Sequence, residues 1–382
     1  MKTLVRSLSC RSERSTEAET LFTTESRSTT ATEISPQALP YDVLRVIFEL
    51  AIEDTDSPKE RQQTCLTIAA LSSDWTEVGL RSLYSSQLTF QTKRFAHKKK
   101  RFSRFYKTLL RDDGLASAVT WLKVDLKLVK ERLTPLLASC ISTLSLHSLT
   151  VLGDTPFLVK AIRPTYPYSL NSLPLFLPNL LSLTLSAVWF NASTISKFLS
   201  DTCLPALTHL TTSQVYAFNE TVLRDGFFSL SAQLTHLTIL DPLRWTRHAL
   251  LRCGPSLAHL RVAEFPRSPS SLRHVLPFLN ASPHPLKTLA IHAQKIPKRP
   301  SLPDSLSILA RGLILGITEK RASLAELEEL TLSGQGWATS EMGVTIGLLG
   351  SVCALKDVKL VVQLEEDAKQ EWVEKVDREG VW

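Results

Sequence analysis

The chain has 382 residues, of which 43% are hydrophobic and 21% charged, so most of it can bury a core. Glycine is scarce, with 13 residues, and no glycine-rich phosphate-binding loop or nucleophile-elbow motif occurs, so we expect neither an enzyme nor a cofactor. The sequence has no apolar run of about 18 residues, and its first residues lack the apolar stretch of a signal peptide. The expected location is therefore the cytoplasm or the nucleus.

The net charge of +7 has a local origin. Nine Lys or Arg residues and no acidic residue occur between Lys93 and Arg111, so the rest of the chain is close to neutral. The six cysteines lie far apart, and none has the C-x-x-C spacing of a zinc or redox site. We therefore expect reduced thiols and no metal site.

Residues 1–35 are rich in Ser, Thr, Glu and Arg, a composition that cannot bury enough apolar surface to offset the entropy of ordering. We expect a disordered tail there. Residues 36–90 are predicted to form a small all-α segment. Apolar residues recur at helical spacing over 38–51, and two further helices are expected over 61–70 and 73–83.

Residues 91–115 are predicted to form a basic linking helix, whose most basic stretch is Lys98, Lys99, Lys100 and Arg101. Three interpretations of this segment stay open. It is the solvated face of a docked helix, a nuclear import signal or site for an acidic partner, or a nucleic-acid surface with interleaved aromatic rings. The aromatic and leucine residues of the segment fall on one helical stripe, which favours the first interpretation.

An apolar-x-x-apolar-x-apolar pattern occurs nine times over 116–363. Six of the eight spacings between its occurrences lie between 22 and 29 residues, the period of leucine-rich repeats. The occurrences begin at Val119, Ile141, Leu180, Leu207, Leu234, Leu257, Leu286, Leu327 and Leu355. Helix-like segments separate them, so each unit is expected to be a strand, a turn and a helix that share a core with their neighbours.

The predicted fold is therefore an α/β solenoid, a leucine-rich-repeat horseshoe of about nine repeats that follows the small helical segment. Residues 364–382 are acidic and then amphipathic, and we expect them to cap the last repeat.

The segment from Leu39 to Tyr84 resembles the F-box family, in which an F-box is commonly followed by leucine-rich repeats. The resemblance rests on Leu39 and Pro40, on the apolar helix that follows them, and on the spacing from that helix to Trp75. The resemblance implies that the helices bind the Skp-type adaptor of a cullin–RING ubiquitin ligase and that the repeats hold a protein substrate. It implies that the adaptor-binding residues are Leu39, Pro40, Val43, Leu44, Ile47 and Phe48, with Trp75 in the supporting core. The alternative is that these helices only cap the repeats.

Strand side chains alternate, so positions one, four and six of each repeat should face the core and positions three, five and seven the opposite surface. The candidate substrate face on that surface comprises Trp121, Lys123, His147, His209, His236, His259, Arg261 and His292. Three of these histidines are expected in register on consecutive strands. A metal site, a pH-sensitive partner patch and a merely solvated polar position are the open interpretations.

The leading hypothesis is a protein-interaction subunit of the ubiquitin-conjugation pathway, a substrate-receptor adaptor. Two alternatives remain: a repeat scaffold without a ligase role, and a nuclear factor that uses the basic segment on nucleic acid, although a nucleic-acid or membrane partner is not the expected one.

Overall fold

The computed structural model describes residues 40–55, 58–85, 88–90, 105, 107–109, 111–125, 141, 144–152, 176–186, 189–190, 201–213, 215–217, 233–240, 254–264, 275–293, 302–338 and 340–364. The chain divides into two units, residues 1–48 and residues 49–382. Helix α2 (Tyr41–Glu53) spans the division. The predicted disordered tail, Leu39, the basic stretch at 98–101 and most of the predicted C-terminal cap lie outside the described residues.

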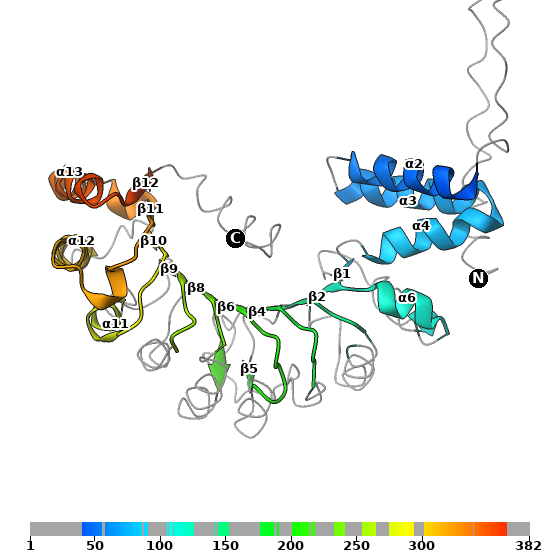
Figure 1. The fold of residues 1–382 in the computed structure, drawn as a ribbon, viewed down its shortest axis with the longest axis horizontal. Helices are drawn as coiled ribbons and strands as arrows, with labels where there is room; N and C mark the ends of the chain where they lie inside the picture. The colour runs from blue at the N-terminus through cyan, green and yellow to red at the C-terminus, as the bar shows by residue number, and fades with distance from the viewer. Residues whose placement is uncertain are drawn as a thin grey trace, which may run out of the picture. The chain divides into compact units, whose positions relative to one another are not determined.

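The three predicted N-terminal helices are present (Figure 1): α2, α3 (Pro58–Leu71) and α4 (Ser73–Ser85). Helices α3 and α4 pack closely because Gly79 has no side chain. A Cβ at Gly79 would lie 2.5 Å from the carbonyl oxygen of Cys65 and 2.8 Å from the Cβ of Ala69. The Thr76 hydroxyl donates to the carbonyl of Ala69 at 2.9 Å, which adds a second tie between the two helices.

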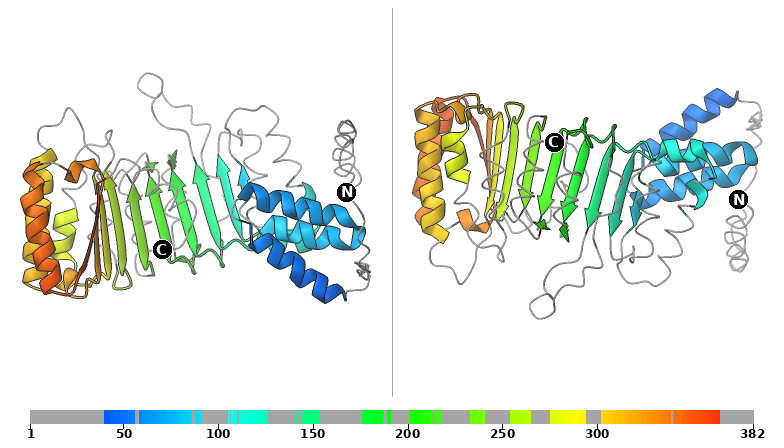
Figure 2. Two further views of the ribbon diagram at one scale, coloured as in Figure 1. Left: turned by 90° about the horizontal axis from the view of Figure 1, so that it is seen from above. Right: turned by 90° about the horizontal axis from the view of Figure 1, so that it is seen from below.

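The remainder of the described chain is organised on one open sheet in which every neighbouring pair of strands is parallel. Figure 2 shows its ten strands side by side in chain order. They are β1 (Leu88–Phe90), β2 (Trp121–Asp125), β3 (Ser148–Leu152), β4 (Ser182–Ser186), β6 (His209–Ser213), β8 (His236–Leu240), β9 (His259–Glu264), β10 (Thr288–Ala293), β11 (Glu329–Ser333) and β12 (Lys359–Gln363). The short strands β5 (Trp189–Phe190) and β7 (Tyr216–Ala217) form a separate pair.

The predicted α/β arrangement is thus confirmed. Parallel strands require crossover connections, and the described crossovers contain helices. These are α6 (Asp113–Ala118), α11 (Val275–Ala281), α12 (Leu302–Thr318) and α13 (Ser340–Leu355), together with the short 3-10 turns η6 (Ala322–Leu324) and η7 (Gln335–Trp337).

The core lies on one face of the sheet, where positions one, four and six of most repeats are buried. In the repeat that begins at Leu234, for example, Leu234, Leu237 and Ile239 are all at most 2% exposed. Each such side chain contributes roughly 1.5–3 kcal/mol when it leaves water. Helix α12 covers part of this face with Leu309 and Leu313, so the stretch after β10 that breaks the repeat spacing holds a long covering helix.

The predicted register is wrong in two repeats. Ser148 pairs with both Trp121 and Ser182, so the second repeat begins at Leu146 rather than at Ile141. Ile141 is fully buried, but it precedes the strand, and an apolar residue packed before a strand resembles a strand residue in the sequence.

The last repeat is displaced as well. Leu355 is 81% exposed at the end of α13, and Lys359, not Asp357, pairs with Glu329. Asp357 adopts a left-handed backbone (φ 57°) where the chain leaves the helix, and this extra turn shifts the strand by two residues. Strand β1, which pairs with β2, was not predicted from the pattern.

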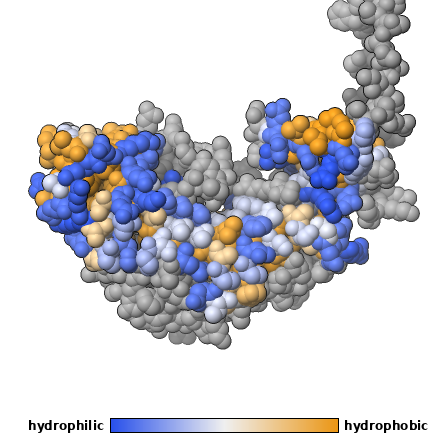
Figure 3. All heavy atoms as spheres, in the orientation of Figure 1, coloured by the Kyte–Doolittle hydropathy of each residue, from blue (hydrophilic) through white to orange (hydrophobic). Residues whose placement is uncertain are grey.

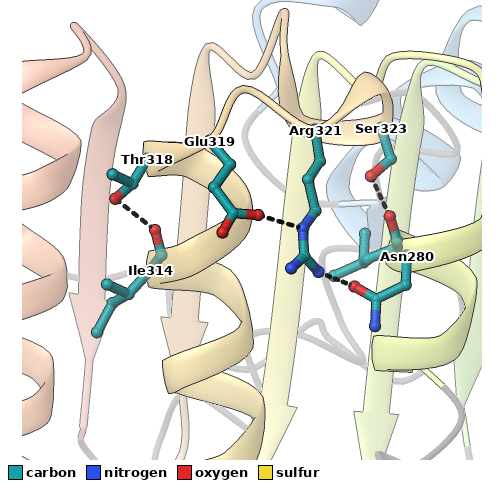
Figure 4. Close-up of polar contacts among 7 residues, drawn as sticks. Asn280, Ile314, Thr318, Glu319, Arg321 and Ser323 are labelled. Carbon is teal, nitrogen blue, oxygen red and sulfur yellow. Dashed lines mark hydrogen bonds and ion pairs between the residues drawn. The ribbon is translucent and has the colours of Figure 1, made fainter.

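A polar network joins the turn after α12 to the end of α11 (Figure 4). Arg321 donates through Nε to Glu319 at 3.0 Å and through a terminal nitrogen to the Asn280 side chain. The Ser323 hydroxyl donates to the carbonyl of Leu279, while the Ser323 carbonyl accepts from the Leu286 amide at 2.9 Å. Ser323 is fully buried, and buried polar groups are costly unless paired, so its bonds fix the approach to β10 and β11, whereas the Arg321 bonds are exposed.

Candidate functional site

Three histidines occupy the same position on consecutive strands, as the repeat pattern predicts. His209 pairs with His236, and His236 pairs with His259, in the registers of β6, β8 and β9. Their rings are stacked: the centroids of His209 and His236 are 4.0 Å apart with planes inclined by 13°, and those of His236 and His259 are 4.1 Å apart and inclined by 15°. We call these three residues the histidine column.

Threonine hydroxyls orient each ring. Thr208 contacts Nδ1 of His209, and Thr235 contacts Nδ1 of His236, each at 2.8 Å. The same two hydroxyls also lie 3.3 Å from backbone carbonyl oxygens, Thr208 from that of Leu181 and Thr235 from that of Thr208, which holds each hydroxyl in place beside its ring. His259 instead contacts the hydroxyl of Thr288, on the next strand, at 2.9 Å.

The environment of the column disfavours the charged form of every ring. Burial, followed by the charges of His209, His259 and Arg261, lowers the pKa of His236 to about 3. Burial also lowers the pKa of His209, and that of His259, where Lys287 adds to the effect and Glu328 opposes it. All three imidazoles are therefore neutral at pH 7, and they stack without charge repulsion.

The column is unsuited to a metal ion. Stacked, nearly parallel rings direct their nitrogens along parallel lines, whereas a tetrahedral metal needs ligands that converge on one point. Among the residues that the model describes, no group of three His, Cys, Asp or Glu side chains is arranged to hold a metal ion. The arrangement offers instead a flat, uncharged edge that can contact a partner through hydrogen bonds and ring surfaces.

The column continues toward the C-terminal end as Thr288, Glu329 and Lys359. The Lys359 ammonium donates to a Glu329 carboxylate oxygen at 2.8 Å, and this bond holds the pKa of Glu329 below its usual range. The surface therefore changes along the sheet from stacked rings to an exposed ion pair.

Other predicted face residues are less accessible. Trp121 and Arg261 are half-buried, but Lys123 is only 6% exposed and offers little surface. The prediction that His292 lies on an open face is wrong: its ring is 1% exposed, and its Nδ1 lies 3.0 Å from the Ser333 hydroxyl.

The turn after β11 explains the burial of His292. Gly334 has a positive φ of 92°, and a Cβ there would lie 2.9 Å from Cε1 of the His292 ring, so this turn covers the ring. His147 is exposed, but it precedes β3 and therefore does not occupy the predicted seventh position; its backbone carbonyl accepts from the amides of Leu181 and Ser182.

Helix α2 carries a second candidate surface. Val43, Val46, Ile47 and Leu50 are 44%, 53%, 44% and 58% exposed, and their i, i+3, i+4, i+7 spacing places them on one stripe. We call this the α2 apolar stripe; Figure 3 shows hydrophobic atoms over α2, at the upper right.

The predicted adaptor-binding residues fall into two groups on α2 and α4. Val43 and Ile47 lie in the stripe and Pro40 is exposed, whereas Leu44, Phe48 and Trp75 are half-buried. Val46 and Leu50 were missed, although their helical spacing from Val43 was the signal that identifies them.

No protein-family model matches the sequence, and a search of curated proteins finds no significant match. Within the described part of the chain, none of the helices has the length and apolar character needed to cross a membrane.

Proposed function

We propose that the protein is a substrate-receptor subunit of a cullin–RING ubiquitin ligase, in which α2 to α4 act as an F-box and the sheet units act as irregular leucine-rich repeats. The observation that carries the proposal is the α2 apolar stripe, an exposed row of aliphatic side chains on a helix that precedes a leucine-patterned parallel sheet.

The repeat assignment is supported by the regularity of the units. The registers align position three of every unit from Trp121 to Lys359, and buried leucines occupy position four of nearly all of them. A single parallel sheet in chain order, with crossovers that contain helices, is the arrangement expected of such repeats.

The adaptor-docking role is supported by the physics of the stripe. Four neighbouring aliphatic side chains in water are unfavourable unless a partner covers them, and burial of each contributes about 1.5–3 kcal/mol. An amphipathic helix that places such a row in a hydrophobic groove is a common mode of recognition. The four side chains are already about half buried, so the gain on docking is smaller than full burial would give, and further contacts across the interface have to add to it to offset the cost of association.

The proposed substrate role is supported by polar side chains on the strands from β6 to β12. The histidine column, half-buried Arg261 and the Glu329–Lys359 pair form a polar surface along several strands. Such a surface suits hydrogen bonding to a peptide or loop. The receptor is then passive: it raises the effective concentration of its substrate beside the ligase core.

The test is a binding measurement between the full chain and a Skp-type adaptor. The Val43→Asp, Ile47→Asp double variant should weaken binding by about 100-fold or more, because two carboxylates would be buried in an apolar interface. Leu181→Asp is the matched control: Leu181 is also an exposed leucine, at 45%, but it immediately precedes β4 and lies outside α2, so this variant should bind as the wild type does. A folded wild-type chain that does not bind the adaptor would refute the ligase role and leave a repeat scaffold.

A further inference from the structure

Helix α13 is apolar on the side that faces water as well as on the side that faces the core. Leu349 on the inner side is fully buried. On the outer side Val344, Leu348 and Leu355 lie on one stripe and are 83%, 55% and 81% exposed. In Figure 3 the exposed side of α13, at the upper left, is coloured as hydrophobic. No charged residue occurs over 342–355, so this outer surface carries no charge of its own.

Helix α12, which packs beside α13, adds to this surface. The two helices contact each other, and their inner sides are buried in the same hydrophobic core. Ile308 and Leu315, two turns apart on α12, are 60% and 50% exposed. Single exposed aliphatic side chains are ordinary, but a group of them on two packed helices is typical of a surface that a partner covers. We call the exposed side chains Ile308, Leu315, Val344, Leu348 and Leu355 the α12–α13 face.

The α12–α13 face has the size of a protein interface. The two helices have 17 and 16 residues and lie side by side. With 1.5 Å per residue and axes about 8–10 Å apart, their shared outline measures about 24 Å by about 20 Å. The accessible area of a ridged surface exceeds its flat outline, so the face approaches the roughly 800 Å² that each partner buries in a stable complex. The size of the face therefore matches a second folded protein.

The shape of α13 favours a second copy of the same helix. Gly343 and Gly347 are exposed, and a Cβ at either one would meet no atom of the described residues within 4 Å, apart from nearby backbone of the helix. Contacts among these residues therefore do not require glycine there, although glycine is unfavourable in a helix interior. The two glycines leave an open row beside the ridge of Val344 and Leu348. In a two-fold contact each copy supplies a ridge for the open row of the other.

The distribution of charge points to the same partner. Two copies carry identical charges, so a surface that pairs with itself has to keep like charges away from the two-fold axis. Helix α13 meets this condition over 342–355. Exposed Arg311 lies on α12 between Ile308 and Leu315, so the centre of the contact belongs on α13 and α12 belongs toward the polar rim.

We propose that a second copy of this chain binds the α12–α13 face, in a two-fold dimer centred on α13. The ridge of Val344 and Leu348 in each copy packs on the glycine row of the other copy, and α12 lies toward the rim. This inference does not depend on the proposed ligase role, because it rests on the exposed sides of α12 and α13 and makes no use of α2.

The oligomeric state of the full chain, measured by sedimentation equilibrium, tests the proposal. Wild type should be a dimer above about 10 μM. Val344→Lys with Leu348→Lys should raise the dissociation constant by about 100-fold or more, because unpaired ammonium groups would be buried in an apolar contact. Leu181→Lys is the control: Leu181 is 45% exposed but precedes β4, so this variant should dimerise as wild type does.

Gly347→Leu separates the interface from folding. A side chain at this position points into open space, and leucine is the better helix former, so the Tm of the diluted, monomeric protein should not fall. The same side chain fills the glycine row and should raise the dissociation constant by about 10-fold or more. A dimer that neither Gly347→Leu nor the double lysine variant weakens would place the contact elsewhere and overturn the proposal. A wild type that is monomeric up to about 100 μM would also overturn it, and the face would then belong to another segment of this chain or to a different protein.

Discussion

The threonine hydroxyl beside each imidazole fixes the orientation of that ring in the histidine column. Thr208 and Thr235 each precede their histidine in the chain and fix Nδ1, while His259 uses Thr288 of the next strand. With Nδ1 held, the rings lie parallel and share their faces, so protonation of one ring would place a positive charge about 4 Å from the next. Neutrality and stacking are therefore one property of this surface.

This coupling predicts an acid-dependent loss of stability. The folded-state pKa of His236 is about 3, below the unfolded value of 6.5, so the unfolded chain binds more protons as pH falls through 6.5. The stability that the neutral His236 ring contributes is fully retained above pH 6.5 and is lost progressively as the pH falls to about 3. Between about pH 7.5 and pH 5, the free energy of unfolding of wild type should fall by about 1 kcal/mol more than that of His236→Phe. The full linkage is about 1.4 kcal/mol per pH unit, but solvent screening of the half-buried ring reduces it.

Urea titrations at the two pH values measure this difference. His284→Phe is the control, because His284 lies outside the column in the turn before β10 and should retain the wild-type pH dependence. If His236→Phe and wild type lose the same stability on acidification, the column is not the acid-sensitive element.

At this scale the sequence predicted the register of the column but not its chemistry. The repeat pattern aligns His209, His236 and His259, and the strand pairing confirms it. The ring planes depend on hydroxyls of neighbouring units, which a pattern within one repeat does not contain. The burial of His292 was missed for the same reason, because the covering turn at Gly334 comes from the next unit.

At the scale of elements, α2 shows why helical periodicity alone leaves the exposed side undecided. Its outer stripe of Val43, Val46, Ile47 and Leu50 is as apolar as its inner row, in which Ile52 is buried and Leu44 half-buried. Periodicity predicts the helix, and the structure confirms it, but two apolar stripes on one helix do not reveal which one faces water. The exposed fraction of each side chain in the structure resolves that choice.

Helix packing in the N-terminal segment predicts a sharp response at Gly79. Gly79→Ala should destabilise the protein by about 1–2 kcal/mol, because the new methyl group would lie 2.5 Å from a backbone carbonyl that cannot rotate away. Gly350→Ala, in the middle of α13, places its Cβ 3.6 Å from a Leu360 methyl, an ordinary contact, and should stabilise by up to about 1 kcal/mol through helix propensity.

Chemical denaturation midpoints of the two variants distinguish the effects. Both changes are the same glycine-to-alanine substitution within a helix, so the intrinsic gain in helix propensity is shared. A Gly79→Ala protein that is as stable as Gly350→Ala would mean that α3 and α4 are not held at the close distance observed.

Over residues 49–382 as a whole, each strand of the main sheet pairs only with its immediate neighbours, so the period of the apolar pattern was enough to predict the α/β class. The boundaries of the repeats were harder to predict from the sequence. Where Ile141 packs ahead of a strand, or where α13 ends on exposed Leu355, the local pattern is the same as that of a strand, and only the pairing with the adjacent unit corrects it.

Neighbour-only pairing also predicts how the molecule unfolds. Leu330 on β11 is fully buried, so Leu330→Ala should cost about 2–5 kcal/mol. Because units couple only to their neighbours, that loss should act locally: amide exchange should rise strongly in β10, β11 and β12 and little in β2, β3 and β4. Leu149→Ala, at the equivalent position on β3, supplies the mirror-image control, with the increase in β2 to β4. Hydrogen exchange resolved by peptide tests both variants together, and a uniform increase across all ten strands in either one would show that the sheet unfolds as a single cooperative block.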